Sequence, residues 1–167
     1  TEVTPGTAWS MLRTNSGATA AEWKNQYRTL AADVTCAVSA SYCTIFSYTP
    51  PVASVGVLLF ARIEIVSAST TVAPRFRVST ADAGYTGNCH YTCFDTATPR
   101  YDFVTIASGT NTADTAWGVA TATMVELRCS LIADASPGAL LVEWTLETGT
   151  TPTQTVKQGS TLTVTQN

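Results

Sequence analysis

The residues best suited to chemistry gather around the single histidine of the chain. Cys89 directly precedes His90, and Cys93 follows three residues later. Thiolate and imidazole groups bind zinc, but a structural zinc site usually takes four ligands from paired short spacings. We therefore expect no metal. We also expect no cofactor, because the chain carries no phosphate-binding glycine loop, EF-hand loop or HExxH motif.

Five cysteines leave at least one outside any intrachain disulfide. The natural local pairs are Cys36 with Cys43 and Cys89 with Cys93, although distance in space decides such pairings and all of them could also stay reduced. Cys129 lies on the apolar side of an alternating stretch, where a buried cysteine behaves as a small hydrophobic residue. We predict that Cys129 is the free thiol.

The remaining polar residues give little support for catalysis. A serine hydrolase needs a base beside its nucleophile, and the chain offers one histidine and no Gly-x-Ser-x-Gly turn. Glu143 and Glu147 share one face of a predicted strand, as paired glycosidase carboxylates would. A solvated surface explains them better, so we expect no catalytic residues and no enzyme.

Aromatic residues concentrate between residues 85 and 103, among Gly, Asn and Pro. Flat rings with polar tips on a loop held by a disulfide are typical of sugar-binding platforms. The candidate ligand-binding residues of this loop are Tyr85, His90, Tyr91, Phe94 and Tyr101. The alternative, which we favour, is that these rings cover the open end of a barrel or a trimer axis.

Alternating apolar residues indicate the strands that must position these groups. Residues 57–66 form a long candidate strand, and residues 123–133 alternate more cleanly. A turn leads to a strand over residues 140–146, which we expect to pair antiparallel with the one before it. Arg128 would then lie opposite Glu143 or Glu147. Residues 154–165 are typical of a closing hairpin.

Length and composition fit one β-rich domain. The chain has 167 residues, of which 45% are hydrophobic and 13% charged, and its abundant threonine favours strands. A net charge of −3 argues against a nucleic-acid partner. No apolar run approaches the ~20 residues that cross a bilayer, so we expect no membrane partner. We predict an all-β, antiparallel jelly-roll sandwich of about eight strands over residues 29–167.

Residues 1–28 show neither strand alternation nor a sustained helical stripe. We predict an extended N-terminal arm, with at most one or two turns of helix over residues 20–30. Trp9 and Trp23 have no evident local core to bury them, so we expect them to act as apolar anchors on another surface.

Four strings of residues in the predicted sandwich match those of a known group of proteins. They are residues 29–35, residues 57–71, the turn at residues 136–138 with the strand after it, and residues 155–164. Together they resemble the small C-terminal β-sandwich modules of tailed-phage virion proteins, such as tail fibres, head fibres and capsid decoration proteins. The last string is the most specific. The small-residue run that ends at Trp23 also resembles linkers of phage fibres.

The resemblance implies a homotrimeric jelly roll, similar to tumour necrosis factor, on the surface of an extracellular virion that assembles in the host cytoplasm. The arm would attach it to the major capsid protein or to another virion protein, as a capsid decoration or head-fibre protein. The alternative is a tail-fibre module that recognises a host surface glycan through residues 85–103. A third possibility is a monomeric sugar-binding domain, but Leu58, Phe60 and Leu141 are apolar where alternation predicts polar residues, which favours an oligomer.

Overall fold

The structure is a computed structural model, and its described elements are all β-strands. It describes residues 8–13, 22–36, 41–49, 56–67, 73–80, 84–94, 100–106, 112–116, 123–135, 138–146 and 154–166. The strands are β1 (Ala8–Arg13), β2 (Glu22–Thr29), β3 (Cys43–Tyr48), β4 (Gly56–Ser67), β5 (Pro74–Thr80), β6 (Tyr85–Phe94), β7 (Arg100–Ile106), β8 (Thr112–Ala116), β9 (Met124–Ala133), β10 (Leu140–Leu146), β11 (Gln154–Val156) and β12 (Thr161–Gln166).

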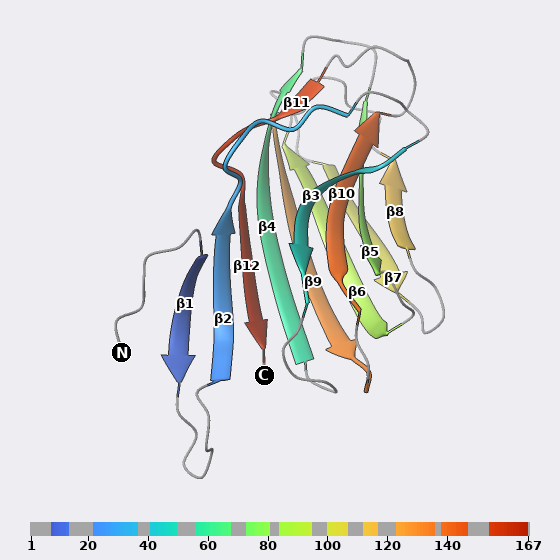
Figure 1. The fold of residues 1–167 in the computed structure, drawn as a ribbon. Helices are drawn as coiled ribbons and strands as arrows, with labels where there is room; N and C mark the ends of the chain where they lie inside the picture. The colour runs from blue at the N-terminus through green and yellow to red at the C-terminus, as the bar shows by residue number, and fades with distance from the viewer. Residues whose placement is uncertain are drawn as a thin grey trace.

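These strands form two antiparallel sheets (Figure 1). The larger sheet has the order β1-β2-β12-β4-β9-β6-β7, with β11 also paired to β4, and the smaller has the order β3-β10-β5-β8. The chain alternates between them: β2, β4, β9 and β12 lie in the larger sheet, and β3, β5, β8 and β10 in the smaller. This is the arrangement of a jelly roll, so the predicted fold is confirmed. Strand β1 and the β6–β7 pair extend the larger sheet at its two edges.

Side-chain alternation places the core between the two sheets. On β4, Leu59 and Ile63 are buried while Leu58 and Glu64 are exposed. Each fully buried aliphatic side chain of this size contributes about 1.5–3 kcal/mol relative to an exposed one. From the smaller sheet, Trp144 packs into the same core.

The predicted pairing of residues 123–133 with residues 140–146 is wrong. Strand β9 lies between β4 and β6 in the larger sheet, whereas β10 lies between β3 and β5 in the smaller. The chain between them therefore crosses from one sheet to the other. As a result, Arg128 does not meet Glu143; its Nη2 instead donates to Glu126 Oε2 at 3.1 Å.

The predicted closing hairpin is also wrong. Strands β11 and β12 pair one after the other with the same strand, β4: Val156 lies opposite Ile65, and Thr161 opposite Arg62. Residues 157–160 bulge out between these two pairings. Gly159 lies in this bulge with a φ of +96°, a conformation that favours glycine.

The bulge is held by the segment that follows β2. The backbone N–H of Gln158 donates to Asp33 Oδ1 at 2.7 Å, and Lys157 Nζ donates to Asp33 Oδ2. The N–H of Leu30 donates to the carbonyl of Ser160 at 2.8 Å. Two of the strings that carry the phage resemblance therefore contact each other.

The described parts of the predicted arm lie in the larger sheet. Strand β2 pairs with β12, and β1 pairs with β2. The helical turns expected over residues 20–30 are wrong, because β12 offers β2 a partner that no local pattern reveals. Trp9 and Trp23 lie on β1 and β2, but their side chains lie outside the described part of the chain. Strand β2 crosses the boundary predicted at residue 28. The division of the chain into an arm and a sandwich domain stays a prediction.

Candidate functional site

The outer face of the larger sheet points away from the core and collects the exposed apolar residues. Among the described residues, all the large hydrophobic side chains that are exposed lie on this face, on β2, β4, β7 and β9. They are Tyr27, Leu58, Val66, Tyr101 and Ile132. Tyr101 is 76% exposed and Ile132 63%. Exposed apolar side chains that gather on one face of a sheet are typical of a site of interaction.

One row of directly paired residues crosses this face. Thr163 of β12 lies opposite both Tyr27 and Phe60, and Arg128 of β9 lies opposite both Phe60 and His90. Residues opposite each other on antiparallel strands point to the same side of the sheet, with Cβ atoms about 4.5–5.5 Å apart. The row thus places two rings, a hydroxyl, a guanidinium and an imidazole beside one another.

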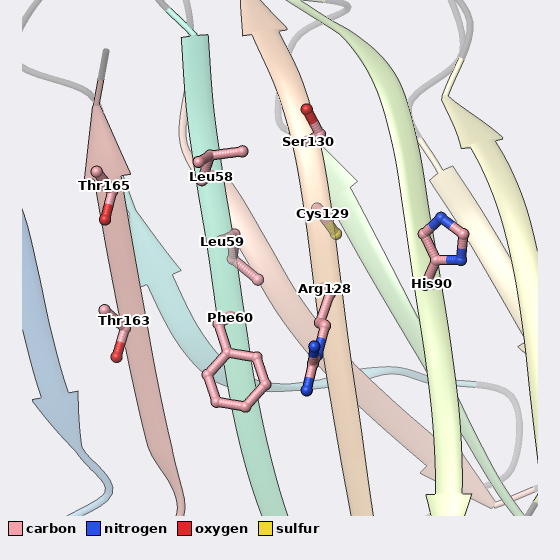
Figure 2. Close-up of a pocket in the computed structure, with 9 residues that line it drawn as sticks. All are labelled: Leu58, Leu59, Phe60, His90, Arg128, Cys129, Ser130, Thr163 and Thr165. Atoms are coloured by element: carbon pink, nitrogen blue, oxygen red, sulfur yellow. The ribbon is translucent and has the colours of Figure 1, made fainter.

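A shallow depression of about 520 Å³ lies along the middle of this row. Figure 2 shows that its side chains come from four neighbouring strands, β12, β4, β9 and β6. The lining residues are Leu58, Leu59, Phe60, His90, Arg128, Cys129, Ser130, Thr163 and Thr165. Apolar residues of β4 form the centre of the depression, and polar groups flank them on both sides.

The charged side chains on the outer side of β4 and β9 lie in and next to the depression. The Arg128 Cζ atom lies 5.1 Å from the centroid of the Phe60 ring, and its side chain is 68% exposed. At this exposure the cation–π contact and the Glu126 ion pair contribute at most about 1 kcal/mol each. Arg62 lies opposite Glu126, and Glu64 follows on β4. The outward side chains of β4 and β9 thus include two arginines and two glutamates, and their charges balance.

The described residues of the predicted ligand-binding loop, 85–94 and 100–103, lie in two paired strands, β6 and β7. Tyr85 and Tyr91 point into the core, at 1% and 0% exposure. The hydroxyl of Tyr85 donates to the carbonyl of Gly138 at 2.9 Å, and that of Tyr91 accepts from the N–H of Val78 at 3.2 Å. These two rings stabilise the sandwich and are not accessible to a sugar.

The other three predicted residues lie on the outer face. His90 lines the depression, while Phe94 lies opposite Met124 and Tyr101 opposite Thr92, nearer the sheet edge. The signal that separates the two sets is alternation: the inward positions are tyrosine or cysteine, except for Gly87, and the positions between them are polar, except for Phe94. The glycine, asparagine and cysteines of this segment obscured it.

Sequence reasoning did not gather the residues that form the depression. Leu58 and Phe60 were detectable as apolar residues on the polar side of β4. Thr163 and Ser130 carry no local signal, because only the pairing of β12 and β9 on either side of β4 brings Thr163 beside Phe60 and Ser130 beside Leu58.

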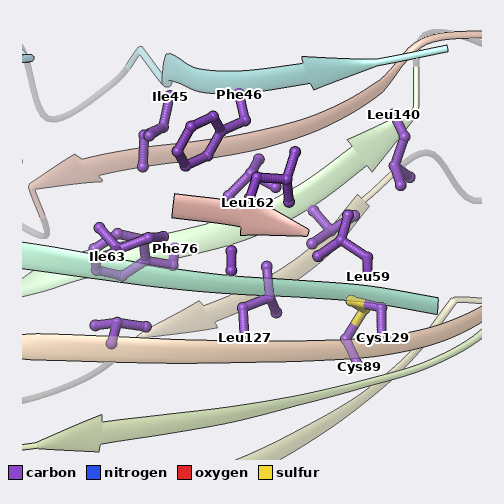
Figure 3. Close-up of a cluster of buried hydrophobic side chains, with 14 of the residues drawn as sticks. Ile45, Phe46, Leu59, Ile63, Phe76, Cys89, Leu127, Cys129, Leu140 and Leu162 are labelled. Carbon is purple, nitrogen blue, oxygen red and sulfur yellow. A yellow bond between two sulfur atoms is a disulfide. The ribbon is translucent and has the colours of Figure 1, made fainter. Parts of the chain in front are cut away.

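Two disulfides are present. Cys36 joins Cys43, one of the two local pairs that the sequence suggested, and Cys89 joins Cys129, as Figure 3 shows. The predicted pair of Cys89 with Cys93 is wrong, because residues four apart on one strand are separated by about 13 Å. Cys129 is therefore not the free thiol; Cys93, which is buried, lies outside both bridges.

The group of Cys89, His90 and Cys93 does not form a metal site. Cys89 is bridged within the core, whereas His90 points to the outer face. Within the described ranges, no three His, Cys, Asp or Glu side chains lie close enough together to hold a metal ion. The described chain also contains no helix of the length and hydrophobicity needed to span a membrane.

No protein-family model matches the chain. No curated protein matches it in sequence. Among solved structures, that of infectious bursal disease virus strain Gx is 12% identical with a TM-score of 0.27, covering 94% of this chain and 44% of that chain. The VP2 subviral particle of the same virus is 12% identical with a TM-score of 0.29, covering 94% of this chain and 45% of that one. The chain spans less than half the length of these structures, and overlaps this low carry no argument about its function.

Proposed function

We propose that the chain is a non-enzymatic structural protein of a bacteriophage virion surface. In this proposal it is a homotrimeric capsid decoration or head-fibre protein, assembled in the host cytoplasm and attached to the major capsid protein or another virion protein through its N-terminal residues. The observation that carries the proposal is the apolar outer face of the larger sheet. The pattern shared with phage modules supports the location on a virion.

The outer face has the properties of a contact between copies of the chain. Leu58 and Phe60 lie at its centre, and burying them would remove apolar area from water at roughly 25 cal/mol per Å². The chain carries a net charge of −3, but the charges on β4 and β9 cancel, so identical faces can approach without net repulsion. Leu141, also predicted at such a contact, lies on the smaller sheet and is half-buried.

The environment of Glu143 supports a non-enzymatic role. This carboxylate is 6% exposed and accepts a hydrogen bond from Arg77 Nε at 2.7 Å. A glycosidase acid or base must be open to substrate and water. Glu147, its proposed partner, lies outside the described residues.

The first test is the mass of the native protein by light scattering. We expect three chains for the wild type, and monomers or aggregates for Leu58→Asp and for Phe60→Asp, because each places a charge in the contact. Thr49→Asp, at an exposed position directly after β3, is the matched control and should stay trimeric. A monomeric wild type, or trimeric Leu58 and Phe60 variants, would contradict the proposed contact.

The second test is attachment to the particle. Purified protein should cosediment with shells that lack it, prepared from the phage that encodes it. We expect Trp9→Ala and Trp23→Ala to reduce this binding while the mass in solution stays that of the wild type. Equal binding by the wild type and both variants would overturn the role of the two tryptophans.

The depression itself favours a second candidate, a receptor-binding module. It offers the hydroxyl of Thr163 and the guanidinium of Arg128 beside the Phe60 ring, and the hydroxyl of Ser130 beside Leu58. Such groups bind acidic sugars. In this case we expect the protein to bind host cells or their surface polysaccharide, and Arg128→Ala to abolish binding. Binding to cells without binding to shells would favour this candidate over decoration.

A further inference from the structure

We propose that the Cys36–Cys43 disulfide is a redox clasp, which keeps a buried ion pair closed on the smaller sheet. The clasp consists of this bridge together with Tyr42, Arg77 and Glu143. The inference goes beyond the proposed function and does not depend on it.

The ion pair lies on the side of the smaller sheet that faces away from the core. Glu143 of β10 lies opposite Arg77 of β5, and its Oε2 atom accepts from Arg77 Nε at 2.7 Å and from Ser79 Oγ at 2.5 Å. Glu143 and Ser79 are each 6% exposed. A carboxylate this deeply buried costs several kcal/mol unless it is paired and hydrogen-bonded. The position of Arg77 therefore decides whether Glu143 is tolerated there.

Tyr42 holds the other side of Arg77. The Arg77 Cζ atom lies 3.7 Å from the centroid of the Tyr42 ring. Tyr42 directly precedes Cys43, the first residue of β3, and Thr44 of that strand lies opposite Glu143. Because Cys36 is buried in the core, the bridge fixes the start of β3 and with it the ring that covers Arg77.

The two bridges differ in how easily they open. β3 pairs only with β10 among the described strands, so Cys43 lies at the end of an edge strand and is half-buried. Cys89 and Cys129 are 0% and 4% exposed and join two strands that each have a neighbour on both sides. Strand ends at a sheet edge open at lower free energy than central strands, so a reductant reaches the Cys36–Cys43 bridge first.

The opening step is an exchange with a dithiol. One thiolate of the dithiol attacks a sulfur of the bridge, forms a mixed disulfide and releases the other cysteine as a thiolate that takes up a proton. The second thiol of the dithiol then attacks the reductant's own sulfur in the mixed disulfide, and the bond between that sulfur and the remaining cysteine breaks. The reductant leaves as its disulfide, and Cys36 and Cys43 each carry one new hydrogen. Tyr42 is then no longer tied to the core and leaves Arg77, so water reaches Glu143.

The test treats the native protein with dithiothreitol, without denaturant, and traps new thiols by alkylation for mass spectrometry. We expect alkylation at Cys36 and Cys43 while Cys89 and Cys129 remain bridged. Amide hydrogen exchange in β4 and β9 reports the general loss of stability on opening the bridge. Exchange in β5 and β10 should rise by a further about two- to fivefold relative to β4 and β9, the change expected from loss of a cation–π contact. Opening of both bridges at the same dithiothreitol concentration would overturn the proposal, as would exchange in β5 and β10 that rises no more than in β4 and β9 once Cys36 and Cys43 are alkylated.

A variant that keeps both bridges separates the ring from the disulfide. Tyr42→Leu should raise exchange in β5 and β10 by about two- to fivefold relative to β4 and β9 without any reductant. Tyr101→Leu, which removes an exposed ring from the larger sheet, is the matched control and should leave β5 and β10 unchanged. If Tyr42→Leu matches this control, Tyr42 does not hold the ion pair and the clasp is disproved.

Discussion

Cys89 and Cys129 lie directly opposite each other on β6 and β9, with their Cα atoms 4.1 Å apart. Strand β6 is not one of the eight strands of the jelly roll, whereas β9 is. The bridge therefore attaches the added β6–β7 pair to the sandwich. It also joins residues 40 positions apart in sequence, against 7 for the bridge between Cys36 and Cys43.

This difference in loop length predicts unequal losses of stability. Removing the Cys89–Cys129 bridge by alanine at both positions should cost about 4 kcal/mol in the free energy of unfolding, and removing the Cys36–Cys43 bridge about 2 kcal/mol, because the longer loop restricts the unfolded chain more. Urea unfolding of the two double variants checks the order. An equal or reversed order would contradict the explanation by loop length.

Gly87 is predicted to be irreplaceable for a steric reason. It has a φ of +146°, and a Cβ atom built on it would lie 2.1 Å from the backbone carbonyl oxygen of Ser130 on the neighbouring strand. Gly87→Ala should therefore destabilise the protein by about 2 kcal/mol or more in thermal unfolding. Gly159→Ala is the control, because Gly159 also has a positive φ but no atom within 4 Å of the added Cβ. Similar losses for both would show that backbone strain, and not the contact with Ser130, dominates.

The pKa of the buried Tyr48 predicts how the stability of the protein changes at alkaline pH. Burial raises the pKa of Tyr48 from 10.0 to about 12, against smaller opposing effects of Arg28 and a hydrogen bond with Gln166. A raised pKa in the folded state stabilises the fold fully below pH 10, and this contribution is lost as the pH rises towards 12. We expect Tyr48→Phe to flatten the loss of stability over this range, measured by urea unfolding at several pH values. The exposed-site variant Tyr101→Phe should leave the profile unchanged, and a Tyr48→Phe profile that follows the wild type would contradict the assignment.

Asp33 predicts a response at acidic pH. The backbone N–H of Gln158, and next the side chain of Lys157, hold the pKa of the Asp33 carboxyl below its usual value of 3.8. A lowered pKa stabilises the fold above the pKa of the unfolded chain, and this contribution is lost as the pH falls through the folded pKa. Asp33→Asn should therefore be less stable than the wild type at neutral pH, and the difference should shrink in strong acid. A difference that stays constant with pH in thermal unfolding would show that charge plays no part.

Much of the architecture is predictable from local patterns. Residues 57–66, 123–133 and 140–146 correspond to β4, β9 and β10, because alternation with a period of two is a property of neighbouring residues and needs no partner strand. The same pattern exposed Leu58 and Phe60 as apolar residues on the wrong side of β4. In β6, by contrast, glycine and cysteine at the inward positions weakened the alternation, so its two buried tyrosines were taken for ligand-binding residues.

The sequence alone determined the class of fold and the positions of its main strands along the chain. It also showed which side of β4 carries apolar residues outside the core. Only the tertiary structure decided which strands are neighbours. It placed β9 and β10 in different sheets, brought Cys129 opposite Cys89, and assembled the depression around Phe60 from four strands. The physical reason is that alternation sets only the direction in which a side chain points. Pairing between distant strands depends on how the whole chain encloses one core, which no short stretch of residues encodes.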